Sequence, residues 1–339
     1  MRAVVVAGPG RVDITDVEEP QPERGAVLTV TAAGVCAADR MIHDGSDPWD
    51  VRFPIVPGHE IVGQVSWIDD ASSAQWGVRT GDRVAVEVKV PCGRCLACQA
   101  DDTHLCQDGQ HLGSDLPGAM AERIAIPPGS RVWRTDGIDD AAAGIIEPVA
   151  CAVHAVRRLG PAAGDVVLVM GAGAIGSAAM AVAASRGAEV LALVRSQERA
   201  QLARDAGAHP IIAPGDGVVA AIRRAAGQVD GVIECTGVAA LVPTALEVVR
   251  PGGRVVLYGV YRAPALLDLN LVAELKEIDV RGGHLAPHGA FGEAVRLLAD
   301  GTVDGARLIT HRHTLDDVLA ALEPAVGPTR VKAVLEPNR

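Results

Sequence analysis

The chain has 339 residues, of which 49% are hydrophobic, so it is long enough for two domains that each bury a core. Its formal net charge of −11, with no local block of Lys or Arg, argues against binding to nucleic acid or to an acidic membrane surface. Residues 1–6 resemble the start of a strand and carry no secretory signal, so we expect a cytoplasmic, reducing location.

The first part of the chain, residues 1–145, consists of short β-rich runs that are separated by Gly and Pro. Examples are residues 27–31, 61–65 and 83–88. Runs of this kind predict a compact β domain with long loops.

Two metal-binding side chains stand at the ends of these predicted strands. Cys36 follows a strand, and His59 lies in the sequence Pro-Gly-His-Glu just before the next one. One thiolate, one imidazole and one carboxylate can form a three-ligand zinc site with a position open for substrate. The remaining carboxylate candidate is Glu147, which lies where the β domain ends.

Four further cysteines are closely spaced in residues 91–107: Cys92, Cys95, Cys98 and Cys106. Thiolates at this spacing can converge on one structural zinc ion. Pro91, Gly93 and the charged pair at residues 101–102 predict an exposed, irregular lobe without helix or strand. The alternative is a pair of disulfides, which would require an oxidising compartment.

After Pro161 the pattern changes to strands that alternate with helices, as in a doubly wound parallel sheet. The predicted strands are Val166–Met170, Glu189–Val194, Pro210–Ala213, Val229–Cys235, Arg254–Tyr258 and Ile278–Gly282. Residues 166–185 are uncharged and about as long as a membrane span, but their glycines favour a strand, a turn and a buried helix. Beyond residue 285, two amphipathic stretches (291–299 and 315–322) and a strand (330–335) are expected to return to the first domain.

A dinucleotide fingerprint follows the first of these strands. The sequence Gly-Ala-Gly-Ala-Ile-Gly at residues 171–176 stands between a strand and an Ala-rich helix, where backbone amides can bind a pyrophosphate. The candidate cofactor-binding residues are Gly171, Gly173, Ala174, Ile175, Gly176, Val194, Arg195, Arg199, Thr236 and Gly259.

The end of the second predicted strand favours NADP over NAD. No Asp or Glu follows Val194 to bind a ribose diol, whereas Arg195 and Arg199 stand one helical turn apart and can bind a 2′-phosphate. The alternative is that both arginines belong to a solvated helix start near Glu198, in which case NAD stays open.

Over nearly its whole length the chain resembles the zinc-dependent medium-chain alcohol dehydrogenases. The sequence Glu-Pro-Val-Ala at residues 147–150, followed by His154, is similar to the polyol (sorbitol) dehydrogenase branch. The resemblance implies an α/β chain with a GroES-like β-barrel catalytic domain at 1–147 and 285–339, and a Rossmann domain at 148–284. It also implies two zinc ions per chain and a homodimer or homotetramer.

For the catalytic zinc, the resemblance implies the ligands Cys36, His59 and Glu147, with Glu60 as an alternate or water-linked ligand. Cys151 would be a bystander in this scheme. Two positions depart from the family pattern. Ala38 replaces a Ser or Thr that passes on the alcohol proton, so we expect water at the metal, Glu60 or His43 to take this role. Leu285 replaces a basic residue, which indicates a rebuilt substrate pocket.

We therefore expect reversible hydride transfer between NADP(H) and a secondary alcohol of a polyol, sugar or aminocyclitol. The loop at residues 47–53 offers Trp49, Asp50 and Arg52 for substrate contacts. One alternative is an NADPH-dependent reductase of an activated C=C or iminium bond, which needs no proton relay. Another is a non-catalytic sensor that binds zinc and nucleotide.

Overall fold

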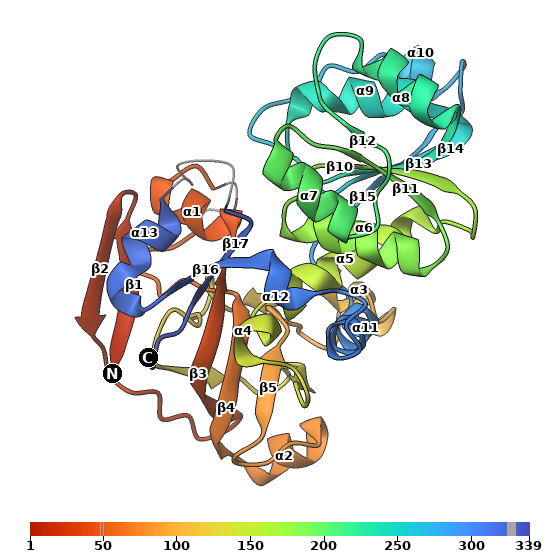
Figure 1. The fold of residues 1–339 in the computed structure, drawn as a ribbon. Coiled ribbons are helices and arrows are strands. Elements are labelled where there is room, and N and C mark those ends of the chain that lie inside the picture. The colour runs from red at the N-terminus through yellow and green to blue at the C-terminus, as the bar shows by residue number, and fades with distance from the viewer. Residues whose placement is uncertain (48, 50, 324–329) are drawn as a thin grey trace. The chain divides into compact units, whose positions relative to one another are not determined.

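The computed structural model describes the whole chain except residues 48, 50 and 324–329. Asp50, one of the substrate-contact candidates, therefore lies outside the described residues. The chain divides into two compact units (Figure 1). Unit 1 comprises Met1–Glu147 and Ala286–Arg339, and unit 2 comprises Pro148–Leu285.

Unit 1 is built on a seven-stranded sheet to which both ends of the chain contribute (Figure 1). The strand order is β16 (Ile309–His313), β17 (Lys332–Leu335), β3 (Ala26–Val35), β4 (Glu60–Ile68), β5 (Arg83–Val86) and β9 (Val132–Arg134), with β8 (Arg123–Ile126) also paired to β3. Smaller pairs are β1 (Arg2–Gly8) with β2 (Arg11–Asp16) and β6 (Lys89–Val90) with β7 (Gln110–His111). Its core consists largely of Val, Ile and Leu from these strands.

The helices of unit 1 are short. They are α1 (Ala37–Asp44), α2 (Asp70–Trp76), α3 (Leu96–Gln99), α4 (Asp140–Ala143), α11 (His288–Ala299), α12 (Gly305–Leu308) and α13 (Val318–Leu322). The C-terminal segment belongs to this unit and contributes α11, α12, α13, β16 and β17. The strand predicted at residues 83–88 ends at Val86, and the strand predicted at 330–335 begins at Lys332.

Unit 2 is a parallel six-stranded sheet with helices on both faces (Figure 1). The order is β12 (Ile211–Ile212), β11 (Glu189–Leu193), β10 (Val166–Met170), β13 (Val229–Glu234), β14 (Val249–Leu257) and β15 (Asp279–Gly282). The central strand β10 is buried on both faces, which explains its continuous apolar sequence. The strand predicted at 210–213 shrinks to two residues, because only Ile211 and Ile212 pair with β11.

The helices of unit 2 are α5 (Ile146–Leu159, which begins in unit 1), α6 (Ala174–Ser185), α7 (Gln197–Asp205), α8 (Val218–Ala226), α9 (Val242–Val248) and α10 (Leu269–Val272). The strand order reverses direction between β10 and β13, so unit 2 is a doubly wound Rossmann sheet. The uncharged stretch 166–185 forms a strand, β10, and a helix, α6, and is therefore not a single long helix. In the described part of the chain, no helix has the length and apolar character needed to cross a membrane.

Candidate active site and metal centres

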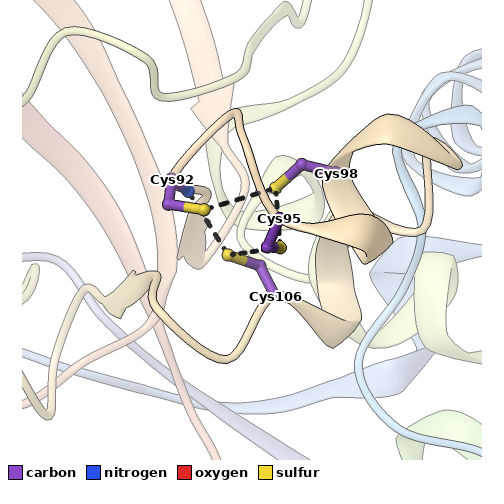
Figure 2. Close-up of side chains that lie close together, drawn as sticks. All are labelled: Cys92, Cys95, Cys98 and Cys106. Carbon is purple, nitrogen blue, oxygen red and sulfur yellow. Dashed lines mark hydrogen bonds between the residues drawn. The ribbon is translucent and has the colours of Figure 1, made fainter.

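The four cysteines of residues 91–107 converge on one point. Figure 2 shows their sulfur atoms turned toward one another. The Sγ–Sγ distances are 3.9 Å for Cys92–Cys98, 3.5 Å for Cys95–Cys98 and 3.7 Å for Cys95–Cys106. A tetrahedral zinc site with Zn–S bonds of about 2.3 Å places its sulfurs about 3.8 Å apart, whereas a disulfide needs about 2.05 Å. All four thiols are free, so the disulfide alternative is not what the structure shows.

The prediction of a wholly irregular lobe was wrong in one respect. The lobe contains one turn of helix, α3, whose N-cap is Cys95, and a 3-10 turn at Thr103–Leu105. Loss of solvation, together with the neighbouring thiols, raises the pKa of Cys98 to about 12. Backbone N–H groups of Arg94 and Cys95 lower the pKa of Cys92 to about 6. Because the crowded thiols would not all ionise alone, the donor set fits a divalent cation that favours thiolates.

A second cluster lies at the paired ends of β3 and β4. Ligand atoms of Cys36, His59 and Glu60 all lie within 4.8 Å of one another. Cys36 follows β3 directly and is the N-cap of α1, while His59 immediately precedes β4. The antiparallel register pairs Gly34 with Glu60, and this pairing brings the two loops together. A side chain at residue 34 would overlap a carboxylate oxygen of Glu60, which explains the glycine.

Asp39, which the sequence analysis did not select, supports this cluster. Its buried carboxylate accepts hydrogen bonds from the backbone N–H of Cys36 at 2.8 Å and of Gly58 at 3.2 Å, and it lies 3.4 Å from Nδ1 of His59. Burial opposes the charge on His59, but Asp39 overcomes this effect and raises the pKa of His59 well above its ordinary value. A carboxylate at Nδ1 fixes the ring and leaves Nε2 for a metal. The signal was present in the sequence, since an acid three residues after an N-cap completes a capping box.

Glu60 is held by a lysine from the far end of the chain. Lys332 on β17 pairs with Oε1 of Glu60, and the two side chains are 5% and 1% exposed. Burial raises the pKa of Glu60 against the effect of Lys332. Oε2 of Glu60 is buried and has no hydrogen-bond partner among the described residues. A buried carboxylate oxygen without a donor, next to a thiol and an imidazole, fits a zinc ion.

The other predicted residues of this region lie farther out. Glu147 is buried in the first turn of α5 and is not part of the group within 4.8 Å, although its charge adds to the raised pKa of Glu60. His43 stands two helical turns along α1 from Cys36, about 10 Å along the helix axis, with Nδ1 buried. The roles given to Glu147 and His43 therefore stay predictions.

The conformation of the glycine loop in unit 2 explains why glycines are needed there. Gly171 has a φ of +95°, which strongly favours glycine, and a Cβ at Gly176 would overlap the carbonyl oxygen of Gly171. A Cβ at Gly173 would meet nothing within 4 Å. Gly173 is the N-cap of α6, so Ala174 and Ile175 form its first turn. The space over Gly173, at a helix N-terminus, fits a pyrophosphate.

The arginines predicted for a 2′-phosphate lie at the end of β11. Arg195 is exposed just beyond Val194, whereas Arg199 is half-buried in α7 and donates from Nη1 to the carbonyl of Ala172 at 2.8 Å. Burial, followed by the neighbouring charge of Arg195, lowers the pKa of Arg199. Arg199 is thus tied to the glycine loop, which a purely solvated helix start would not require.

Comparison with known proteins identifies the family. Residues 22–136 match the alcohol dehydrogenase GroES-like domain, and residues 174–300 match the zinc-binding dehydrogenase domain. The chain is 33% identical to erythritol/L-threitol dehydrogenase of Mycolicibacterium smegmatis over 99% of its own length and 98% of that protein. The chain belongs to the zinc-binding alcohol dehydrogenases. This result confirms the predicted family, the GroES-like and Rossmann fold class and the oxidoreductase class.

Two further proteins are similar to this alcohol dehydrogenase over most of its length. The chain is 32% identical to L-threonine 3-dehydrogenase of Pyrococcus horikoshii, over 92% of this chain and 91% of the relative. A crystal structure from Sinorhizobium meliloti 1021, assigned as a zinc-binding dehydrogenase and bound to NADP, superposes with a TM-score of 0.90. The two proteins are 28% identical, and 99% of each chain is covered.

Replacing Asp39 tests the support of the Cys36–His59–Glu60 cluster. We expect Asp39→Asn to weaken metal retention at this cluster by roughly 10- to 100-fold, because a supporting carboxylate fixes the ring of a metal-ligating histidine. Chelator competition followed by elemental analysis measures the effect, with the exposed Asp70→Asn as control. Equal retention in both variants would contradict the role of Asp39.

Alanine at two glycines of the fingerprint should have different effects. Gly176→Ala should lower the melting temperature, because its methyl group overlaps the Gly171 carbonyl. Gly173→Ala should leave the melting temperature nearly unchanged and still weaken nucleotide binding, because its methyl group would occupy space that the pyrophosphate needs. Thermal denaturation and calorimetric titration with NADPH separate the two effects, and unimpaired binding by Gly173→Ala would refute this interpretation.

Proposed function

We propose that this alcohol dehydrogenase uses NADP(H) to interconvert a ketone and a secondary alcohol that stands beside another polar group, as in a polyol, sugar or aminocyclitol. The observation that supports this proposal is the Cys36–His59–Glu60 cluster, with its buried carboxylate oxygen directed at no hydrogen-bond donor among the described residues. Zinc bound there would supply Lewis-acid polarisation of the substrate oxygen. NADP would supply the hydride acceptor.

The residues around the cluster prepare it for a cation. Cys36 and His59 supply the thiolate and the imidazole, and Asp39 orients the ring. The carboxylate ligand comes from Glu60, which lies in the cluster, or from Glu147, which the family resemblance implies. The charge of Glu147 disfavours the ionised form of Glu60, and a bound cation would relieve this repulsion.

We infer that the lobe of residues 91–107 binds a second zinc ion, so that each chain holds two zinc ions. The lobe is small, and three of its four cysteines are half-exposed, so little apolar burial is available to hold it. A metal bound by four thiolates would supply this missing stability.

Preference for NADP rests on the end of β11. Arg195 and Arg199 are close enough for their charges to interact, and Arg199 is fixed against the glycine loop. Two adjacent guanidinium groups favour a phosphate, and the similar Sinorhizobium meliloti protein was solved with NADP. NAD is the alternative cofactor.

The alcohol proton needs a route other than a hydroxyl at Ala38. Glu60 is better placed than His43 to take part, because Glu60 belongs to the cluster and His43 lies two turns along α1. Water at the metal is the remaining route that the sequence suggests.

The proposed substrate class is based on the substrates that the names of the similar proteins give. Erythritol, L-threitol and L-threonine each carry a secondary hydroxyl next to a carbon with a second hydroxyl or an amino group. Such a neighbour can hydrogen-bond in the pocket and orient the reacting carbon.

A substrate panel tests the proposed reaction. We expect the protein to contain two zinc ions, and to turn over one or more of erythritol, L-threitol, L-threonine or an aminocyclitol with NADP. Cys36→Ser should lose one zinc and nearly all alcohol oxidation while still binding NADPH, whereas Cys98→Ser should lose the other zinc. Enal or iminium reduction by the Cys36→Ser variant would favour the reductase alternative, and nucleotide binding without any turnover would favour the sensor.

Cofactor preference has its own test. Arg195→Ala should raise the KM for NADP by roughly tenfold or more, because it removes a charge-assisted contact to the 2′-phosphate. The KM for NAD should change little, since NAD lacks that phosphate. Arg204→Ala, at an exposed arginine of the helix α7 that follows Arg195, is the matched control. An equal rise of both KM values would argue against a phosphate contact.

We also propose that the protein is a homodimer or homotetramer whose subunits associate through β15. This strand stands at the end of the sheet order, and apolar side chains on the strand and in the segment that precedes it are exposed: Leu266 (93%), Leu269 (72%), Leu275 (64%) and Val280 (39%). An open strand edge beside exposed apolar groups favours association with a second copy. Light scattering should show a dimer or a tetramer, and Val280→Lys should shift it toward the monomer; a monomeric wild type would exclude this interface.

The cysteines are consistent with a cytoplasmic location. All seven are free, including the four that lie together in residues 91–107. Thiols persist in this state in a reducing compartment.

A further inference from the structure

Glu234 is a buried carboxylate that has no role in the proposed reaction. It is the last residue of β13, and its exposed fraction is 0%. An ionised carboxylate in such a place is costly unless hydrogen bonds replace its water. The groups around Glu234 must therefore supply these hydrogen bonds.

Four neutral donors surround this carboxylate. Oε1 accepts from the backbone N–H of Thr236 at 2.6 Å and from the Thr236 hydroxyl. Oε2 accepts from the backbone N–H of Gly237 at 3.2 Å and from the hydroxyl of Tyr261 at 2.5 Å. Hydrogen bonds to an ionised acceptor are roughly twice as strong as neutral ones, so this carboxylate holds its donors firmly.

The donors come from two different loops. Thr236 and Gly237 follow β13, whereas Tyr261 follows β14. The loops are also in direct contact: Gly237 has a φ of +67°, and its ideal Cβ would lie 2.5 Å from the carbonyl oxygen of Val260. A Cβ at Gly259 would lie 2.8 Å from Oε2 of Glu234. Glu234 thus joins two closely packed loops that contain two predicted cofactor residues, Thr236 and Gly259.

A third loop belongs to the same arrangement. The methyl group of Thr236 would lie 2.9 Å from an ideal Cβ on Gly171, the first glycine of the fingerprint. The backbone N–H of Cys235 also donates to the carbonyl of Met170, the last residue of β10, at 3.0 Å. The loops after β10, β13 and β14 are therefore connected at the carboxyl ends of three neighbouring strands.

These strands flank the point where the sheet order reverses, which is where dinucleotides bind. The end of β11 faces the ribose next to the adenine, so the strands on the other side, β13 and β14, face the nicotinamide half. Loops that must bind this half gain affinity if they are already ordered before the cofactor arrives.

We propose that Glu234 is a positioning residue that orders the loops after β13 and β14 for the nicotinamide half of the cofactor. The proposal rests on the proposed function, because it requires that unit 2 binds a nicotinamide dinucleotide. The carboxylate acts through Thr236, Gly237 and Tyr261, and it serves the oxidised and the reduced cofactor alike.

The test compares Glu234→Gln with the wild-type protein in calorimetric titrations with NADPH and with NADP⁺. An amide places an NH₂ group against donors that need an acceptor, so we expect Kd to rise about tenfold for both cofactor forms. In steady-state assays, KM for the cofactor should rise by a larger factor than kcat falls. Glu247→Gln, the same change on an exposed residue of α9, should match the wild type.

Tyr261→Phe provides a second variant if Glu234→Gln does not fold. It removes one of the four donors without altering charge, and we expect a rise in Kd of about threefold for both forms. Wild-type Kd values in both variants would overturn the inference, as would a loss restricted to NADP⁺, which would indicate direct charge stabilisation of the oxidised ring. Failure of the wild type to bind any nicotinamide cofactor would instead overturn the proposed function.

Discussion

The candidate metal site of this alcohol dehydrogenase depends on the pairing of β3 with β4. The register that sets Gly34 opposite Glu60 brings the Cys36 loop and the His59 loop to the same end of two strands. Because side chains alternate along a strand, a shift of one residue would turn Glu60 away from the cluster. The site is therefore a consequence of sheet register, and the glycine at position 34 leaves the room that the Glu60 carboxylate occupies.

The same end of the sheet must also accommodate several buried acids. Asp39 is compensated by two backbone N–H groups and by His59, and Glu60 is half compensated by Lys332. β17 delivers this lysine because it is inserted between β16 and β3. Return of the C-terminal segment to unit 1 thus supplies a buried cation to the site, in addition to a strand for the sheet.

Much of this organisation could be predicted from the sequence because its signals are local. The four cysteines lie within 15 residues, and the glycine fingerprint needs only six residues between a strand and a helix. Asp39 could also have been selected, since it stands three residues after Cys36 at a helix start. Lys332 could not, because 272 residues separate it from Glu60 and only the assembled sheet brings them together.

The predicted secondary structure was wrong where contacts with distant residues decide the local conformation. The strand predicted at residues 210–213 is short because only Ile211 and Ile212 pair in register with β11, and no local sequence pattern shows this. The lobe at residues 91–107 was expected to lack helix, yet the Cys95–Cys98 spacing suits a single turn, which turns both thiols toward the same point. In both cases the partner, whether a strand or a set of thiols, decides the local conformation.

Glu60 and Glu234 show how the surroundings of a buried carboxylate indicate its role. Both stand at a strand end and both are almost fully buried. Glu234 has donors on both oxygens, four in all, so it has no capacity left for a ligand and holds backbone in place. Glu60 has Lys332 on one oxygen, while the other lies beside a thiol and an imidazole without a donor among the described residues. The satisfied acid is thus suited to positioning loops, and the half-satisfied acid is suited to binding a metal ion.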